Sequence, residues 1–292
     1  MMNSEKDKVN EKESAQRERT FNGMTAREWT INSRSVWNDL SSTRKSQHLA
    51  HGATYPEKLC DRVISIYSKE GDLVLDPFLG TGTTVISAIK NNRLAVGIEL
   101  TKKYFKIASK FVDQSRSLFY KTEPTLLNGD CETELLKLND NSVQLTLTSP
   151  PYANLIHKVV EDRQLRHKKS KFVEENNAKT KIYSDSPADL GNMEIGKYVE
   201  KVERIMRILF KKTKAGGYCV WVVKDFRDTR NKIPYINLHG KIIECGERAG
   251  FLHHDLIIWD QNEQRSLVLL GYPSVFYVNQ NHSYLVVLRK PK

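Results

Sequence analysis

The sequence lacks the features of a disulfide-bonded or membrane-spanning protein. Its four cysteines, at positions 60, 131, 219 and 245, include no CxxC pair and no nearby histidine at zinc spacing. We therefore expect reduced thiols, with neither a disulfide framework nor a metal site. The longest apolar runs, such as 219–223, are far shorter than the ~18 residues that a membrane span needs. The first 20 residues have no apolar stretch typical of a signal peptide. These absences predict a cytoplasmic protein without a membrane partner.

The chain also has too little glycine and proline for a collagen-like or low-complexity protein, with 15 Gly and 9 Pro in 292 residues. Its charge is less ordinary, because 46 Lys and Arg against 35 Asp and Glu give a net charge of +11. Such a balance favours a polyanionic partner such as nucleic acid, although solubility alone is the alternative explanation. Residues 1–20 alternate acids and bases and predict a disordered charged tail. Residues 21–292 show one continuous globular pattern, which we interpret as a single domain.

Short apolar runs alternate with helix-like stretches along this domain. The strand-like runs are 73–75, 94–98, 125–127, 143–147, 218–223, 256–259 and 284–288. The helical stretches are 83–91, 101–117, 132–136, 196–212 and 238–249. Alternation of this kind predicts an α/β fold with a mostly parallel sheet covered on both faces. No helix separates the last two runs, so we expect the final strand to insert antiparallel. Ligands of such sheets bind at the carboxyl ends of the strands.

The first predicted strand leads into a glycine-rich turn, DPFLGTGTT at 76–84. It is neither a phosphate-binding Walker A loop nor a complete GxGxxG turn, and plain strand–helix packing is the alternative explanation. Two further carboxylates, Glu99 and Asp130, end the second and third strands. Glu99 could accept hydrogen bonds from both ribose hydroxyls, and Asp130 could accept one from an adenine amine. Because three acidic groups would repel a pyrophosphate, the pattern indicates S-adenosylmethionine rather than NAD or ATP.

The fourth strand leads into the segment SPPY at 149–152. Two prolines fix an extended backbone and remove two N–H donors, so the segment presents acceptors, a hydroxyl and an aromatic ring. A proline-stiffened turn would explain the prolines but not their neighbours. The Ser149 hydroxyl and the Pro150 carbonyl could grip both hydrogens of a planar exocyclic amine and free its lone pair. Tyr152 could stack on a base that has been flipped out of the duplex.

These segments together resemble the DNA amino-methyltransferases of bacterial restriction–modification systems, which methylate cytosine N4 or adenine N6. The resemblance covers roughly residues 50–292. It rests on HGATYP at 51–56, the glycine-rich turn, Glu99, Asp130, SPPY and NHSY at 281–284. It implies the Rossmann-like S-adenosylmethionine-dependent methyltransferase fold, with a seven-stranded, mostly parallel sheet and an antiparallel last strand. The cofactor motifs precede SPPY here, whereas many relatives have the opposite order.

The resemblance also assigns roles to individual residues. The cofactor residues it implies are Asp76, Phe78, Gly80, Gly82, Glu99 and Asp130, with Tyr55 and Pro56 as weaker additions. The catalytic residues it implies are Ser149, Pro150, Pro151 and Tyr152. Basic residues after the fourth and fifth strands could contact DNA phosphates, although a solvated face is the plainer explanation of any charge run. They are Arg163, Arg166, Lys168, Lys169, Lys224, Arg227 and Arg230. The cluster from 211 to 214 precedes a strand, and we assign it to solubility.

Serine at position 149 favours cytosine N4 over adenine N6 as the methylated atom. The resemblance therefore predicts site-specific methylation of duplex DNA by base flipping and direct transfer, with adenine N6 as the alternative. A catalytically silent nucleic-acid-binding homologue is the alternative from another class. No large target-recognition region is evident, and the candidates are 21–50, 153–190 and 260–280. A companion restriction endonuclease acting at the same site would fit the family.

Overall fold

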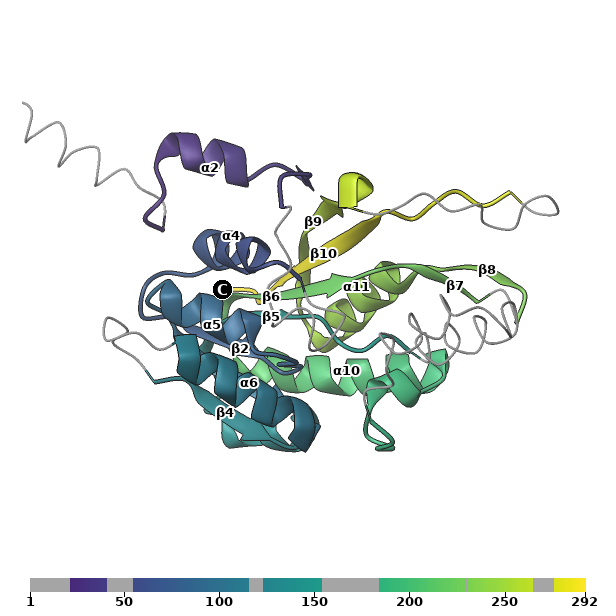
Figure 1. The fold of residues 1–292 in the computed structure, drawn as a ribbon, viewed down its shortest axis with the longest axis horizontal. Helices are drawn as coiled ribbons and strands as arrows, with labels where there is room; N and C mark the ends of the chain where they lie inside the picture. Colours follow the sequence, from purple (N-terminus) through teal and green to yellow (C-terminus); the bar gives the residue numbers. More distant parts are fainter. Residues whose placement is uncertain (1–21, 41–54, 116–122, 154–183, 229–230, 265–275) are drawn as a thin grey trace, which may run out of the picture.

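The fold is taken from a computed structural model of the chain, and the structure describes residues 22–40, 55–115, 123–153, 184–228, 231–264 and 276–292. The predicted charged tail at 1–20 lies outside these residues. Within them, the strands form one large sheet and one two-stranded sheet (Figure 1). The strands are β1 (Val36–Trp37), β2 (Leu73–Asp76), β3 (Leu94–Glu99), β4 (Thr125–Asn128), β5 (Val143–Thr148), β6 (Thr213–Val223), β7 (Phe226–Asp228), β8 (Ile233–Ile236), β9 (Leu252–Asp260) and β10 (His282–Arg289).

The large sheet has eight strands in the order β1-β9-β10-β6-β5-β2-β3-β4. Strand β10 runs antiparallel to both of its neighbours, β6 and β9, while the other pairings in this sheet are parallel. The predicted α/β sheet with an antiparallel last strand is therefore confirmed. The expected number of seven strands is one too few, because the two-residue β1 adds to the edge of β9. A strand so short carries no periodicity that the sequence could reveal.

The helices are α2 (Ala26–Asn32), α4 (Glu57–Tyr67), α5 (Thr83–Lys90), α6 (Lys102–Ser115), α7 (Cys131–Glu134), α10 (Ile195–Lys212) and α11 (Leu238–Ala249). Three short 3₁₀ helices span Leu135–Lys137, Leu190–Asn192 and Asn262–Gln264. All the helices predicted from the sequence are present. Helix α4 was missed, although its buried positions, among them Leu59, Val63 and Tyr67, follow a helical spacing. No helix in the described ranges is both long and apolar enough to cross a bilayer.

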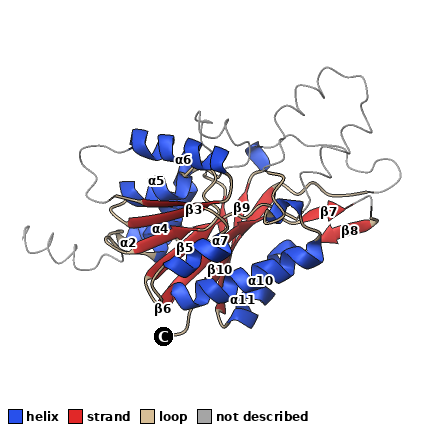
Figure 2. Ribbon diagram, turned by 90° about the horizontal axis from the view of Figure 1, so that it is seen from below, coloured by secondary structure: helices blue, strands red, loops and turns tan. Residues whose placement is uncertain are grey.

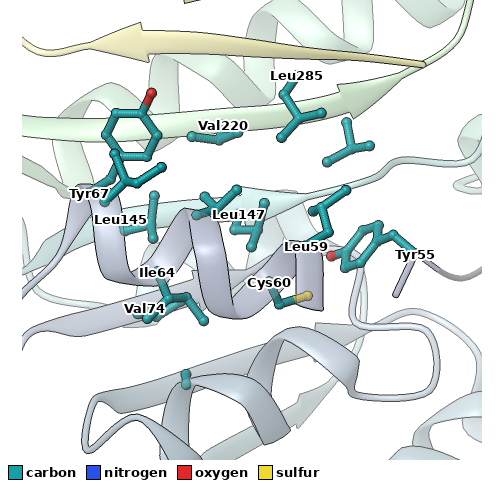
Figure 3. Packing of buried hydrophobic residues seen from close by; sticks show 14 of the residues in the cluster. Tyr55, Leu59, Cys60, Ile64, Tyr67, Val74, Leu145, Leu147, Val220 and Leu285 are labelled. Carbon is teal, nitrogen blue, oxygen red and sulfur yellow. The ribbon is translucent and has the colours of Figure 1, made fainter. Parts of the chain in front are cut away.

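The helices cover the large sheet on both faces (Figure 2). Successive strand residues point to opposite faces, so each strand contributes to two cores. Val74 and Val220 pack with α4 and α5 in one core, whereas Leu75 and Trp221 pack with α10 and α11 in the other. Figure 3 shows the first core, where α4 lies across the sheet. Because both faces are closed, the strand ends are the place where the sheet can present functional groups.

Residues 22–40 pack against this sheet. Trp37 is 1% exposed and Leu40 is fully buried in the core beside α4. Arg62 on α4 stacks over the Trp37 ring and forms an ion pair with Asp39. These side chains therefore hold the N-terminal segment to the fold. Of the recognition segments expected at 21–50, 153–190 and 260–280, residues 21, 41–50, 154–183 and 265–275 lie outside the described residues.

Candidate active site

Four neighbouring parallel strands bring the acidic segments and SPPY to one edge of the sheet. Strands β5, β2, β3 and β4 are adjacent in that order and point the same way. They end at Thr148, Asp76, Glu99 and Asn128. The glycine-rich turn, Glu99, Asp130 and SPPY therefore lie at the carboxyl ends of neighbouring strands, as the sequence predicts for a ligand site.

The glycine-rich turn requires glycine at two positions. Gly80 has φ +58° and Gly82 has φ +90°, both in the left-handed region that other residues rarely adopt. A Cβ atom at Gly82 would also lie 3.2 Å from Cγ2 of Val112. Gly82 is the N-cap of α5, so the turn directs the N-terminus of this helix toward the site.

Glu99 holds the glycine-rich turn as well as ending β3. Its Oε2 accepts a 2.9 Å hydrogen bond from the Gly80 amide, and its Oε1 accepts two from Thr101, through the amide and the hydroxyl, both 2.9 Å. The side chain is buried, and burial raises the pKa of this carboxyl while the hydrogen bonds lower it. A carboxylate offers about four acceptor positions, so one remains for a ligand hydroxyl.

Asp76 connects the glycine-rich turn with the end of β5. Its Oδ1 accepts a 2.7 Å hydrogen bond from the Thr148 hydroxyl and one of 3.1 Å from the Phe78 amide. Its Oδ2 accepts a 3.3 Å bond from the Tyr55 hydroxyl, which also lies 2.5 Å from Oγ1 of Thr84. Asp76 is 1% exposed, and burial raises its pKa. Its buried carboxylate therefore supports the glycine-rich turn and links it to the end of β5.

Asp130 is held by a buried lysine that the sequence did not single out. Its Oδ1 caps α7 by accepting from the Glu132 amide, and its Oδ2 lies 2.9 Å from Nζ of Lys201 on α10. Lys201 is 4% exposed and also donates a 2.9 Å hydrogen bond to the Ala188 carbonyl. The Asp130 side chain nevertheless stays 28% exposed. Lys201 joins α10 to the end of β4, a contact that only the tertiary structure creates.

The SPPY segment follows Thr148 directly. Pro150 is buried, while Ser149, Pro151 and Tyr152 are half-buried. Tyr152 packs against the same hydrophobic core as Phe78 of the glycine-rich turn. The Phe78 ring meets the Trp221 ring edge-on at 6.0 Å. Phe78, which is expected at the cofactor, and Tyr152, which is expected at the base, therefore pack against the same hydrophobic core at this edge of the sheet.

A second polar cluster lies farther along this edge, where β6 ends and β10 begins. Asp225 is 2% exposed and accepts from the His239 amide at 3.1 Å and from the Tyr235 hydroxyl at 2.6 Å. Nδ1 of His239 lies 2.8 Å from the same carboxylate, and the His239 ring stacks on Tyr284 at 4.0 Å. The Tyr284 hydroxyl lies 2.9 Å from Nε2 of His282. The sequence singles out His282 and Tyr284 within NHSY, but it does not reveal that Asp225 and His239 join them, because the members are spread over 60 residues.

Residues 2–110 match the N6/N4 methyltransferase family, described as DNA methylase. Over these residues the chain is similar to the N6/N4 DNA methylases. The matched residues contain Tyr55, Pro56, the glycine-rich turn and Glu99, and they end before SPPY.

The curated relatives are similar over part of their length. The type II methyltransferase M.MthZI of Methanothermobacter thermautotrophicus is 40% identical over 89 residues, covering 28% of this chain and 24% of that protein. The type II methyltransferase M.BglI of Bacillus subtilis is 37% identical over 93 residues, covering 32% of this chain and 26% of that protein. The matches thus span about a quarter of these relatives. Among solved structures, TrmN from Thermus thermophilus aligns with 86% of this chain and 55% of its own, at 14% identity and a TM-score of 0.47.

Of the seven basic residues expected to contact DNA, the structure describes two, and both contact the protein's own backbone. Lys224 donates a hydrogen bond to the Gln280 carbonyl. Arg227 donates one of 3.1 Å to the Val278 carbonyl and lies 4.8 Å from the Tyr277 ring centre. Both cations therefore hold the chain segment before β10. The remaining five, Arg163, Arg166, Lys168, Lys169 and Arg230, lie outside the described residues.

The basic cluster from 211 to 214, which the sequence assigns to solubility, includes a side chain with a different role. Lys212 is 7% exposed and donates 2.7 Å hydrogen bonds to Asp140 and to the Leu138 carbonyl. It therefore closes the turn before β5, and its assignment to solubility was wrong.

Proposed function

We propose that this chain is a type II DNA methyltransferase that transfers a methyl group to the N4 amine of cytosine in duplex DNA. The observation that carries the proposal is the hydrogen bond from Thr148 to Asp76, 2.7 Å long. It ties the segment that would hold the methyl donor to the segment that would hold the amine, and so fixes the two loops at one sheet edge. Transfer between two bound molecules requires such fixed placement.

The residues at the edge fit S-adenosylmethionine, which supplies an electrophilic methyl group when bound. One acceptor position of Glu99 remains for a ribose hydroxyl, and the half-buried Phe78 ring offers an apolar surface. Asp130 keeps a partly exposed carboxylate for an amine. Asp76 and Glu99 lie buried at the same edge, so a pyrophosphate would meet two negative charges.

The reaction would proceed by direct transfer to the amine. The Ser149 hydroxyl and the Pro150 carbonyl accept hydrogen bonds from the two amine hydrogens, which frees the nitrogen lone pair for attack. Tyr152 stacks on the extruded base, and its position against the core limits the movement of that base. The four cysteines are fully or almost fully buried, and burial raises the pKa of each thiol, which does not favour a covalent cysteine intermediate.

Adenine N6 is the second candidate for the methylated atom, because the same acceptors would grip its amine. A silent DNA-binding homologue is the candidate from another class, and the ordered acceptors of SPPY argue against it. A companion endonuclease and a cytoplasmic location stay predictions.

Nucleoside mass spectrometry of DNA incubated with the protein and S-adenosylmethionine tests the proposal. We expect N4-methylcytosine in DNA from a host without methylation. N6-methyladenine instead would reassign the base, and no modified nucleoside above a no-enzyme control would favour the silent homologue. The Ser149→Ala variant is the matched control, since it keeps the loop and removes one acceptor. It should lower the rate of methylation while DNA binding persists.

A further inference from the structure

Two large apolar side chains are exposed in the segment before β10, at the same edge of the sheet as the candidate active site. Phe276 is 84% exposed and Val278 is 77% exposed, the two highest values for large apolar side chains in the part of the chain that the structure describes. Two more, Ile233 at 37% and Tyr235 at 45%, belong to the neighbouring β8. An exposed apolar group of this kind indicates a surface that another molecule covers.

The segment that carries these side chains is anchored at several successive points. Arg227 donates to the Val278 carbonyl and lies over the Tyr277 ring. Lys224 donates to the Gln280 carbonyl, and the Gln261 amide donates a 2.7 Å hydrogen bond to the Asn281 carbonyl. Tyr277 is therefore turned toward Arg227, while the residues on either side of it are exposed. We call 276–280 the clamped segment.

The clamped segment lies at the same edge as SPPY. It leads into β10, where Tyr284 is paired with Val223 at the end of β6, and Trp221 of β6 is paired with Thr148 at the end of β5. Figure 1 shows the clamped segment, in yellow before β10, and the β7–β8 pair extending on the same side of the molecule. A duplex that delivers a base to SPPY would therefore pass close to it.

Charge decides which partner fits this surface. The protein carries a net charge of +11, Lys224 and Arg227 bind the clamped segment, and the exposed Lys232 lies in the turn before β8. A polyanion is favoured there over a neutral or basic protein surface. DNA-binding proteins that distort the duplex often insert apolar side chains between base pairs, and extrusion of a base costs stacking energy that such an insertion replaces.

We propose that Phe276 and Val278 form an apolar wedge that enters the base stack of duplex DNA next to the extruded base. This rests on the proposed function in one respect, that duplex DNA is the substrate. The hydrogen bonds from Lys224 and Arg227 fix the backbone of the clamped segment before DNA binds. Binding therefore costs little conformational entropy in this segment. Loss of the wedge should weaken binding most to DNA in which a stacking gap already exists, because there the wedge gains its contacts without the cost of unstacking a base pair, and should therefore reduce the preference for such DNA.

The test measures fluorescence anisotropy of the full chain with two duplexes of equal length, one fully paired and one with an internal abasic site. We expect the wild type to bind the abasic duplex more tightly than the fully paired duplex, whatever the base sequence of the DNA. The Phe276→Ala/Val278→Ala variant should bind the abasic duplex about five- to a hundredfold more weakly, the range of one lost aromatic–base stack. It should also lose most of the preference between the two duplexes. Leu252→Ala is the matched control, since Leu252 is 57% exposed at the opposite end of the sheet.

Three outcomes would overturn the wedge. The double variant could keep the wild-type affinities and the wild-type preference, or the Leu252→Ala control could lose as much as the double variant. Sedimentation could instead show that the wild type is a dimer and the double variant a monomer, which would assign the surface to a second copy of the chain. Circular dichroism of each variant excludes unfolding. Methylation by the wild type is measured separately, so a failure of the proposed function is distinguished from a failure of the wedge.

Discussion

Replacing Glu99 by glutamine separates cofactor binding from support of the glycine-rich turn. The wild-type carboxylate accepts three hydrogen bonds, one from Gly80 and two from Thr101. Glutamine has the same shape but only one acceptor oxygen, so its amide can keep the Thr101 bonds and must face the Gly80 amide with a donor. We therefore expect the loss of one hydrogen bond to a charged group, which costs about 1.5–3 kcal/mol.

That cost predicts a fall in Tm of about 3–12 °C for a domain of this size. Glutamine also removes the acceptor left for a ribose hydroxyl, so the affinity for S-adenosylmethionine should fall by about 10- to 150-fold. Differential scanning calorimetry measures the first effect and titration calorimetry the second, both at a temperature where the variant is folded.

Thr101→Val is the matched control for this experiment. It removes a hydroxyl that donates to Glu99 and accepts from the Tyr104 amide, and it leaves the Glu99 charge in place. We expect a loss of stability of about 1–3 kcal/mol with little change in affinity for the cofactor. If Glu99→Gln binds the cofactor as tightly as the wild type, Glu99 only supports the turn and its assignment to the cofactor site is wrong.

Three further predictions concern other residues. Tyr152→Ala should slow single-turnover methylation about ten- to a hundredfold, whereas Tyr152→Phe should stay near the wild type, and an equally inactive Phe variant would refute stacking as its role. Lys201→Met should remove the charged hydrogen bonds to Asp130 and to the Ala188 carbonyl, lowering the free energy of unfolding in urea by about 1.5–3 kcal/mol, and an unchanged midpoint would contradict this. Burial and the nearby Lys224 lower the pKa of His282, so the folded state binds fewer protons than the unfolded state below pH ~6.5. Stability should therefore fall as the pH drops through that window and be flat above it, and His282→Gln should make this slope shallower; an identical slope would show that other groups cause it.

The sequence alone predicts the elements that follow from patterns of neighbouring residues. The first three strand runs are each followed by a glycine-rich turn or a carboxylate and then by a helix, so the α/β class and the ligand edge could be predicted without coordinates. The rigid, extended backbone of SPPY could likewise be predicted, because proline restricts the backbone wherever it occurs. The antiparallel β10 could be predicted because the sequence shows no helix-like stretch between the last two strand runs, and the structure pairs β10 antiparallel with β9.

Only the tertiary structure decides which groups meet across the sheet edge. Asp76 and Thr148 are 72 residues apart, and Lys201 and Asp130 are 71 residues apart, so their contacts depend on the strand order and on the helix that packs behind it. The structure adds that the buried carboxylate of Asp76 supports the glycine-rich turn, while its predicted contact with the cofactor stays a prediction. Charge runs show the same limit, since a basic residue in the sequence does not reveal whether it faces solvent, DNA or, like Arg227, a carbonyl of its own chain. The composition determines the net charge of the protein, whereas the packing of the chain determines which group each charged side chain contacts.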